Sequence, residues 1–149
     1  MVHALEEIHR LLRLDGVLID IHPYPQPPII QVLKEKEVVF AQPKRDIEDE
    51  NEDVLKADLA LAEIVDRRIF EVERYEDFDF FSYAPSVPEL RDFWDRYNEY
   101  ESTPKEESRL AQEEAVYAKA EEIRLNIGEG ARAAVHERTK IARLKPIRN

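Results

Sequence analysis

The sequence predicts an α/β protein with α+β character, organised as one domain over residues 1–149. Three observations predict this class. Several segments repeat apolar residues with a helical period, a short β-branched run follows the first of them, and two longer segments alternate as strands do. We expect about four helices and a mixed sheet that contains one buried strand, a hairpin and a C-terminal pair of antiparallel strands.

The N-terminal segment is predicted to form a helix over residues 2–14, followed at once by a strand over residues 17–21. Apolar side chains recur in the helix at intervals of three and four residues, at Leu5, Ile8 and Leu12. Gly16 suits the left-handed position that ends a helix. The strand is β-branched and almost continuously apolar, which is typical of a strand covered on both faces.

A hairpin is predicted next, because residues 29–33 and 38–42 are strand-like and flank a charged stretch. The acidic run at residues 46–53 then favours the start of a helix, where negative charge suits the helix dipole. A calcium loop is disfavoured, because no glycine bends the run. The helix is expected to end at Arg68. Its expected buried face consists of Val54, Ala57, Leu61 and Val65, with Leu55, Leu59 and Ala62 beside them.

Residues 69–84 are predicted to form a strand, with a bulge or a turn at Glu76 and Asp77. One face is expected to carry Phe70, Val72, Phe78 and Phe80. Two capping boxes then predict helix starts, at Ser86–Glu89 and at Thr103–Glu106. The apolar stripe of the first helix is Leu90, Phe93, Trp94 and Tyr97, and the expected buried residues of the second are Val116, Ala120, Ile123 and Ile127.

The helix that starts near residue 103 is expected to end at Gly128, and a last strand is predicted over residues 133–144. One face of this strand is expected to carry Val135, Thr139 and Ile141. From residue 131 to the end there are six basic side chains against one acidic side chain. We interpret this excess as internal electrostatic complementarity to the acidic remainder, and a strip for nucleic acid is the weaker interpretation.

Charge and composition exclude several classes of function. The net charge of −11 argues against nucleic-acid binding and against anionic membranes as partners. The chain has no cysteine, so disulfides, thiolate nucleophiles and zinc–thiolate sites are excluded. Its three glycines leave little for a phosphate-binding loop. No apolar run has the length of a membrane span, and no signal peptide is visible at the N-terminus, so we expect a cytoplasmic protein.

Residues 4–19 (ALEEIHRLLRLDGVLI) resemble a segment of the class I S-adenosylmethionine-dependent methyltransferases. In that family the helix after the fourth strand reads roughly L-x-E-x-x-R-V-L-R-P-G-G and leads into the fifth strand. The residues that match are Leu5, Glu7, Arg10, Leu12, Arg13 and Gly16. Leu14 and Asp15 stand where proline and glycine are usual. Residues 57–65 also look like a subgroup of bacterial methyltransferase-like proteins.

The resemblance implies the C-terminal half of such a domain. Its fifth, sixth and last strands correspond to residues 17–21, 69–83 and 133–144, and the last two pair antiparallel. The hairpin (29–42) and the helices (86–127) are insertions. The glycine-rich turn and the ribose-binding acid of the family have no counterpart here, so no residue is assigned to bind cofactor. The resemblance thus implies a module that is not catalytic on its own. The alternative is a fragment of a working enzyme, from a truncated gene start or a split enzyme, and such a fragment would bind S-adenosylmethionine once completed by the missing half.

The candidate catalytic residues are Asp20, His22 and Tyr24, because open α/β sheets place ligands at the carboxyl ends of their strands. His22 could act as a general base that Asp20 orients. The competing and stronger interpretation is a histidine hydrogen-bonded to backbone at the entry of a loop. No histidine pair has the spacing of metal ligands.

A homodimer is expected, through the unpaired edge of residues 17–21 or through the apolar faces of helices 2–14 and 103–127. The hairpin of the same chain is an alternative cover for that strand edge.

Overall fold

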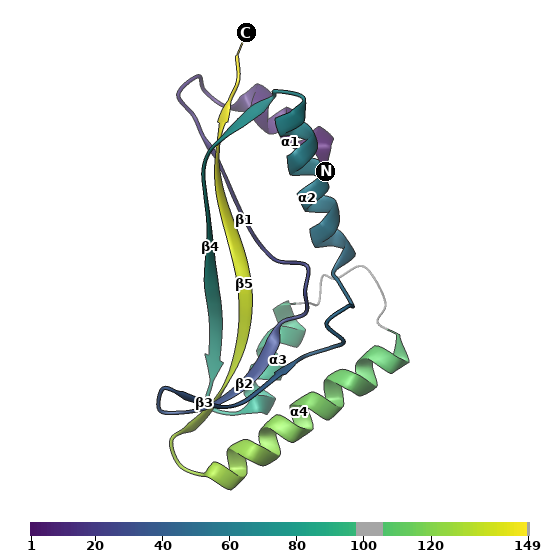
Figure 1. Cartoon of the computed structure of the whole chain (residues 1–149), viewed down its shortest axis with the longest axis vertical. Coiled ribbons are helices and arrows are strands. Elements are labelled where there is room, and N and C mark those ends of the chain that lie inside the picture. Colours follow the sequence, from purple (N-terminus) through teal and green to yellow (C-terminus); the bar gives the residue numbers. More distant parts are fainter. Residues whose placement is uncertain (98–105, 149) are drawn as a thin grey trace. The chain divides into compact units, whose positions relative to one another are not determined.

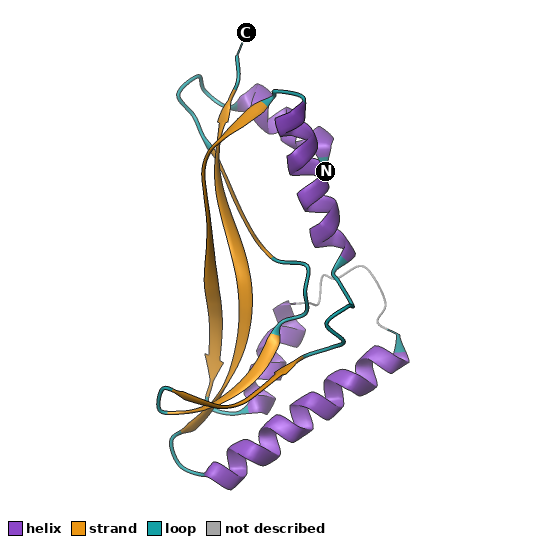
Figure 2. Ribbon diagram, in the orientation of Figure 1, coloured by secondary structure: helices purple, strands orange, loops and turns teal. Residues whose placement is uncertain are grey.

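The computed structural model describes residues 1–97 and 106–148, which hold four helices and five strands (Figures 1 and 2). In chain order the elements are α1 (Val2–Leu11), β1 (Leu18–Pro23), β2 (Ile29–Lys34), β3 (Glu37–Pro43), α2 (Glu52–Asp66), β4 (Phe70–Ala84), α3 (Val87–Tyr97), α4 (Glu107–Ile127) and β5 (Ala131–Pro146). The α/β class with four helices, a hairpin and a C-terminal antiparallel pair is confirmed.

The sheet is antiparallel throughout, where the sequence predicted a mixed sheet. β5 pairs with β1, with Leu18 opposite Leu144, and with β2, with Ile30 opposite Val135. β4 also pairs with β5. β1 and β4 run in the same direction, but each pairs with β5 and not with the other, so no parallel ladder forms.

The chain divides into two compact units, each with its own core. Unit 1 comprises Met1–Pro25, Glu50–Asp79 and Arg138–Asn149, and unit 2 comprises Gln26–Asp49 and Phe80–Glu137. Unit 2 therefore consists largely of the hairpin and helices that the sequence marked as insertions. That the whole chain behaves as a single domain stays a prediction.

In unit 1, α1 and α2 pack on one face of β1, β4 and β5 (Figure 2). The buried core is Ile64, Phe70, Ala142 and Leu144. Asn51 begins α2 by accepting hydrogen bonds from the backbone N–H groups of Asp53 and Val54, so the acidic run does lead into a helix. The expected buried face of α2 is shifted, because Ala60 and Ile64 are the buried residues and Leu59 is 71% exposed.

β1 is not buried on both faces, which corrects the prediction of one buried strand. Leu18 packs on the core of unit 1, whereas Ile19 and Ile21 are 47% and 57% exposed. The reason is that the helices of unit 1 cover only one face of its sheet. α1 also ends at Leu11 instead of residue 14, since Leu12 already has the extended backbone that leads toward β1.

β4 runs without a turn, but its side chains do not alternate as predicted. Phe70 belongs to the core and Val72 lines a cavity beside α2. Arg74 and Glu76 instead line a second cavity, which faces the opposite side of the sheet. The alternation is therefore interrupted between Val72 and Arg74, slightly before the bulge or turn expected at Glu76 and Asp77, and the four predicted residues do not share one face.

Unit 2 contains the predicted hairpin and the predicted start of α3. α4 begins at Glu107, and Glu106, which was expected inside the helix, is its extended N-cap. The Ser86 capping box forms, with the Ser86 hydroxyl accepting from the Glu89 N–H at 3.3 Å. Leu90 and Trp94 of α3 are buried, but Phe93 is 51% exposed, so the predicted stripe is narrower than expected. The core of this unit is formed by Ile30, Val32, Val87, Leu90, Trp94, Val116, Tyr117, Ala120, Ala133 and Val135. The capping box at Thr103 and the side chain of Tyr97 lie outside the described residues.

Within residues 1–97 and 106–148, none of the helices combines the length and the apolar character needed to cross a membrane.

Candidate functional site

The predicted site residues Asp20 and His22 lie together on the α2 side of unit 1. His22 is at the end of β1, with a side chain only 12% exposed. Its Nδ1 lies 2.6 Å from Asp20 Oδ2. Its Nε2 lies 2.8 Å from Asp58 Oδ1, which projects from α2. The histidine thus connects two carboxylates, one from its own strand and one from the covering helix.

Lys140 of β5 completes this cluster. Its Nζ donates to the same Asp58 oxygen at 2.6 Å, and its side chain is 13% exposed. Burial raises the pKa of Asp58, but the hydrogen bonds from Lys140 and His22 outweigh burial and bring the pKa below its ordinary value. Asp58 is therefore held as a carboxylate that ties α2 to β1 and β5. We call Asp20, His22, Asp58 and Lys140 the histidine cluster.

Tyr24 belongs to a separate, more exposed group. Its hydroxyl donates to Asp77 Oδ1 at 2.8 Å and lies 3.0 Å from the hydroxyl of Tyr75. Tyr75 also donates to Asp77, and Arg138 pairs with the other carboxylate oxygen at 3.2 Å. The hydrogen bonds from Tyr24 and Tyr75, with that from Arg138, lower the pKa of Asp77. The ammonium of Lys140 lies 4.7 Å from the centre of the Tyr24 ring and links this group to the histidine cluster.

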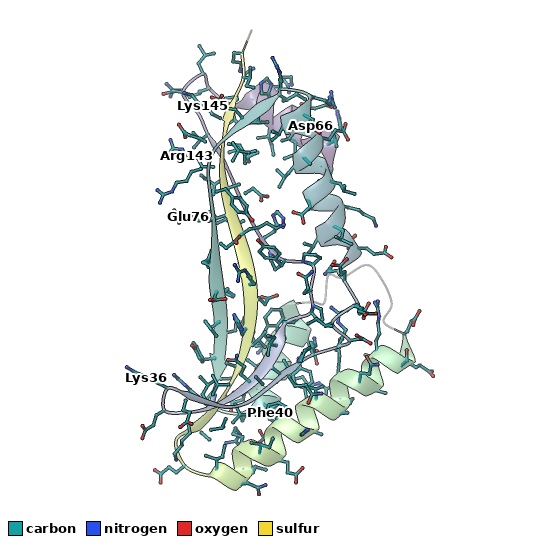
Figure 3. All side chains as sticks on the ribbon, in the orientation of Figure 1. Lys36, Phe40, Asp66, Glu76, Arg143 and Lys145 are labelled. Atoms are coloured by element: carbon teal, nitrogen blue, oxygen red, sulfur yellow. The ribbon has the colours of Figure 1, made fainter. Side chains whose placement is uncertain are left out.

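A cavity of about 370 Å³ opens beside the histidine cluster, between α2 and the strands of unit 1. Figure 3 labels Asp66 at one end of α2. The cavity is lined by Asp20, His22, Asp58, Leu61, Ala62, Val65, Asp66, Val72, Tyr75, Lys140, Ala142 and Leu144.

The geometry favours binding and anchoring over proton transfer by His22. A general base needs a ring nitrogen free to take a proton from a substrate. Here both nitrogens of His22 face carboxylate oxygens, so this role would require one of the two contacts to break. The partners of the histidine are side chains, in place of the backbone partner that the stronger interpretation expected. Among the described residues, no group of three or more His, Asp or Glu is placed to hold a metal ion.

The sequence reasoning missed Asp58 and Lys140, although each left a signal. Asp58 is a lone acid among Leu55, Leu61 and Val65, at the spacing of one helix face. Lys140 alternates with Ala142 and Leu144, which face α2. A charge at an inward position indicates a buried partner.

The ion pairs Lys140–Asp58, Arg138–Asp77 and Arg143–Glu73 agree with the predicted internal complementarity of the basic C-terminal segment.

Asp58→Asn is expected to lower the free energy of unfolding at pH 7 by about 1–2 kcal/mol, since Lys140 and His22 lose a charged acceptor that is only partly exposed. Because folding lowers the pKa of Asp58, the stabilisation is present above the unfolded pKa of about 3.9 and is lost as pH falls through the folded value. Urea unfolding at pH 7 and pH 3 measures this, with Asp53→Asn, an exposed change on the same helix, as control. An equal deficit at both pH values contradicts the assignment.

Comparison of the chain with protein-family models, with curated proteins and with solved structures finds no match.

Proposed function

We propose that this chain is a methyltransferase-like half domain that is not catalytic on its own and that acts by self-association or by binding a protein partner. The observation that carries the proposal is an uncovered apolar sheet face in unit 1. We call it the open face and define it by Ile19, Ile21, Arg74, Glu76, Ile141 and Arg143.

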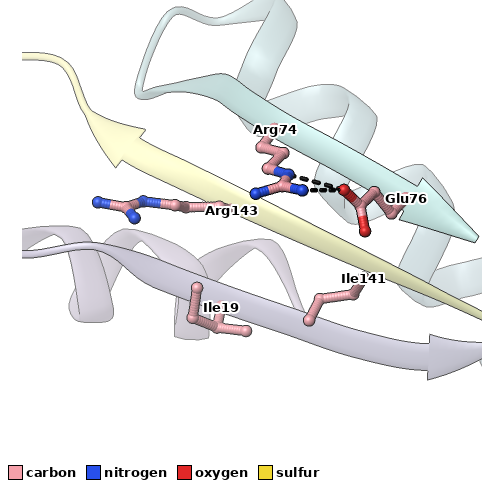
Figure 4. A pocket seen from close by; sticks show the side chains of 5 residues that line it. All are labelled: Ile19, Arg74, Glu76, Ile141 and Arg143. Carbon is pink, nitrogen blue, oxygen red and sulfur yellow. Dashed lines mark hydrogen bonds and ion pairs between the residues drawn. The ribbon is translucent and has the colours of Figure 1, made fainter.

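The open face lies on the side of the sheet away from α2, as the labelled Glu76 and Arg143 show in Figure 3. An antiparallel sheet with one face in water normally presents polar side chains there. Here Ile19 and Ile21 are about half exposed, at 47% and 57%. Ile19 and Ile141 border a cavity of about 280 Å³ (Figure 4). Apolar residues at these positions favour a surface that is covered by a partner.

The charges at this surface favour a second copy of the chain as that partner. Arg74 pairs with Glu76 on the same strand, and Arg143 Nε pairs with Glu73 at 2.6 Å. Two arginines and two glutamates balance locally, although the chain carries a net charge of −11. Two copies would repel each other over most of their surface and least at the open face. A two-fold homodimer would bring the same face of each copy together.

The expected homodimer thus uses the sheet face instead of the strand edge first expected. One edge of β1 pairs with β5, and no other strand pairs with β1 within the described residues. The hairpin does not cover this edge, because β2 pairs with β5. The sequence adds the remaining parts of the proposal, namely a cytoplasmic location and neither membrane nor nucleic acid as partner.

Light scattering tests self-association. We expect twice the chain mass of 17.5 kDa at micromolar concentration. Ile21→Asp should return the mass to that of one chain, because a desolvated carboxylate at the seam is costly. Leu59→Asp is the matched control, since Leu59 is 71% exposed on α2 of the same unit, away from the open face. A single-chain mass for the unmodified protein would contradict the homodimer and leave a different protein as the partner.

The strand order of unit 1 supports the methyltransferase-like part of the proposal. In the resembled family the last strand lies between the fifth and the sixth and pairs antiparallel with the sixth. Here β5 pairs with both β1 and β4, the counterparts of those two strands. A second candidate is a fragment of a working methyltransferase. It is favoured because the fifth strand of the resembled family also pairs with a fourth strand, and that fourth strand has no counterpart here.

Calorimetry with S-adenosylmethionine separates the two candidates. We expect no measurable binding by the chain alone, because neither the glycine-rich turn nor the ribose-binding acid has a counterpart in the sequence. One-to-one binding in the micromolar range would instead support the fragment of a working enzyme.

A further inference from the structure

We propose that the cavity between α2 and the sheet of unit 1 is a binding site for a small organic cation with an aliphatic body, such as a primary alkylamine. The site lies wholly within unit 1, on the opposite side of the sheet from the open face. The inference is therefore independent of self-association.

The walls of the cavity select an aliphatic body. α2 contributes Leu61, Ala62 and Val65 at helical spacing, and β5 contributes Ala142 and Leu144 from the opposite side. At about 370 Å³, the volume is within the range of roughly 300–1,000 Å³ found for small-molecule sites. Such sites combine apolar walls with a few polar groups that orient the ligand.

The charges around the cavity select a cation. Three carboxylates line it, those of Asp20, Asp58 and Asp66, against the ammonium of Lys140. The lining is net negative whether or not His22 carries a positive charge. An anionic ligand would meet these carboxylates in a chain whose net charge is already −11.

Asp66 is the carboxylate that remains available to a ligand. Asp20 faces His22, and Asp58 is bonded to His22 and Lys140. Asp66 is exposed in the last turn of α2, and it makes no ion pair within the described part of the chain. The negative end of the helix dipole also favours a positive charge there. An ammonium group at Asp66 thus meets both a carboxylate and the negative end of the helix.

The length of the cavity along α2 suits this orientation. Asp58 and Asp66 are eight residues apart, which corresponds to about 12 Å along a helix. Leu61, Ala62 and Val65 lie between them on the lining. An alkyl chain that extends from an ammonium at Asp66 would lie against these side chains and point toward the histidine cluster.

Hexylamine is the probe, with hexanoate as its anionic counterpart of similar size. Millimolar hexylamine is expected to shift the NMR methyl signals of Ala62 and Ala142, and hexanoate is expected to leave them unchanged. Ala62→Phe fills the cavity without changing its charge and should weaken binding by about tenfold or more. Asp66→Asn should weaken binding by roughly two- to fivefold, as for an exposed ion pair.

Asp53→Asn serves as the matched control, because Asp53 is exposed at the other end of α2, outside the cavity. Equal shifts with hexanoate would overturn the selectivity for cations. Unchanged affinity in Ala62→Phe would overturn the location, and no shift with hexylamine would overturn the site. The mass measured by light scattering should be the same with and without hexylamine, which separates this test from that of the homodimer.

Discussion

Trp94→Ala is expected to lower the free energy of unfolding by about 3–5 kcal/mol, the usual cost of deleting a large aromatic side chain from a core. Trp94 is only 8% exposed and lies in the core of unit 2 with Leu90, Val116 and Tyr117. β2 also contributes residues to this core. Because β2 is part of the sheet, these residues cannot move to fill the space that the indole would leave. Urea unfolding followed by circular dichroism measures the loss.

Phe93→Ala is the matched control for this prediction. Phe93 is the neighbouring residue on α3. Its ring packs edge-on against that of Trp94, with the two ring centroids 6.4 Å apart. It is nevertheless 51% exposed, so its deletion should cost at most about 1 kcal/mol. Equal losses for the two variants would show that α3 does not present its Trp94 face to the core.

Glu113→Gln is expected to cost a similar amount, about 3–5 kcal/mol, for an electrostatic reason. The Glu113 side chain on α4 is 6% exposed, and its Oε2 lies 3.4 Å from the ammonium of Lys44, which is 5% exposed. Its other oxygen lies 3.8 Å from Arg45 Nε. A glutamine keeps the shape but removes the charge, and the buried ammonium of Lys44 then loses this carboxylate. Chemical denaturation at neutral pH measures the effect.

The next residue in the chain provides the control. Glu114 pairs with Arg91, but its side chain is 56% exposed and that of Arg91 is 38% exposed. Solvent screens such a pair, so Glu114→Gln should destabilise the protein far less than Glu113→Gln. If Glu113→Gln proves equally mild, the Lys44–Glu113 pair is not buried in the protein in solution.

Local signals in the sequence predicted most element boundaries. The Ser86 capping box begins α3, the charged stretch between two strand-like segments forms the turn of the hairpin, and Gly128 ends α4 with a positive φ of 80°. These features depend on a few neighbouring residues, which explains why they can be predicted without knowledge of the fold. The end of α1 could not be predicted in this way, because Leu12 leaves the helix to lead into β1.

Only half of the candidate site was predicted, because local patterns do not show contacts between distant parts of the chain. Asp20 and His22 are two residues apart on one strand, so alternation alone places them on one face. Asp58 and Lys140 join them from positions 36 and 118 residues further along the chain than His22. No local pattern brings these four side chains together, because their contact depends on how α2 covers the sheet.

The sequence by itself determined the α/β class, the hairpin, the starts of the first three helices and the electrostatic complementarity of the C-terminal segment, because these follow from local periodicity, capping and charge. Only the tertiary structure decided which face of each element is buried. The isoleucines of β1 suggested a strand buried on both faces, yet α1 and α2 cover one face of unit 1 and leave Ile19 and Ile21 exposed. Burial depends on what packs against a residue, and that partner comes from a distant part of the chain.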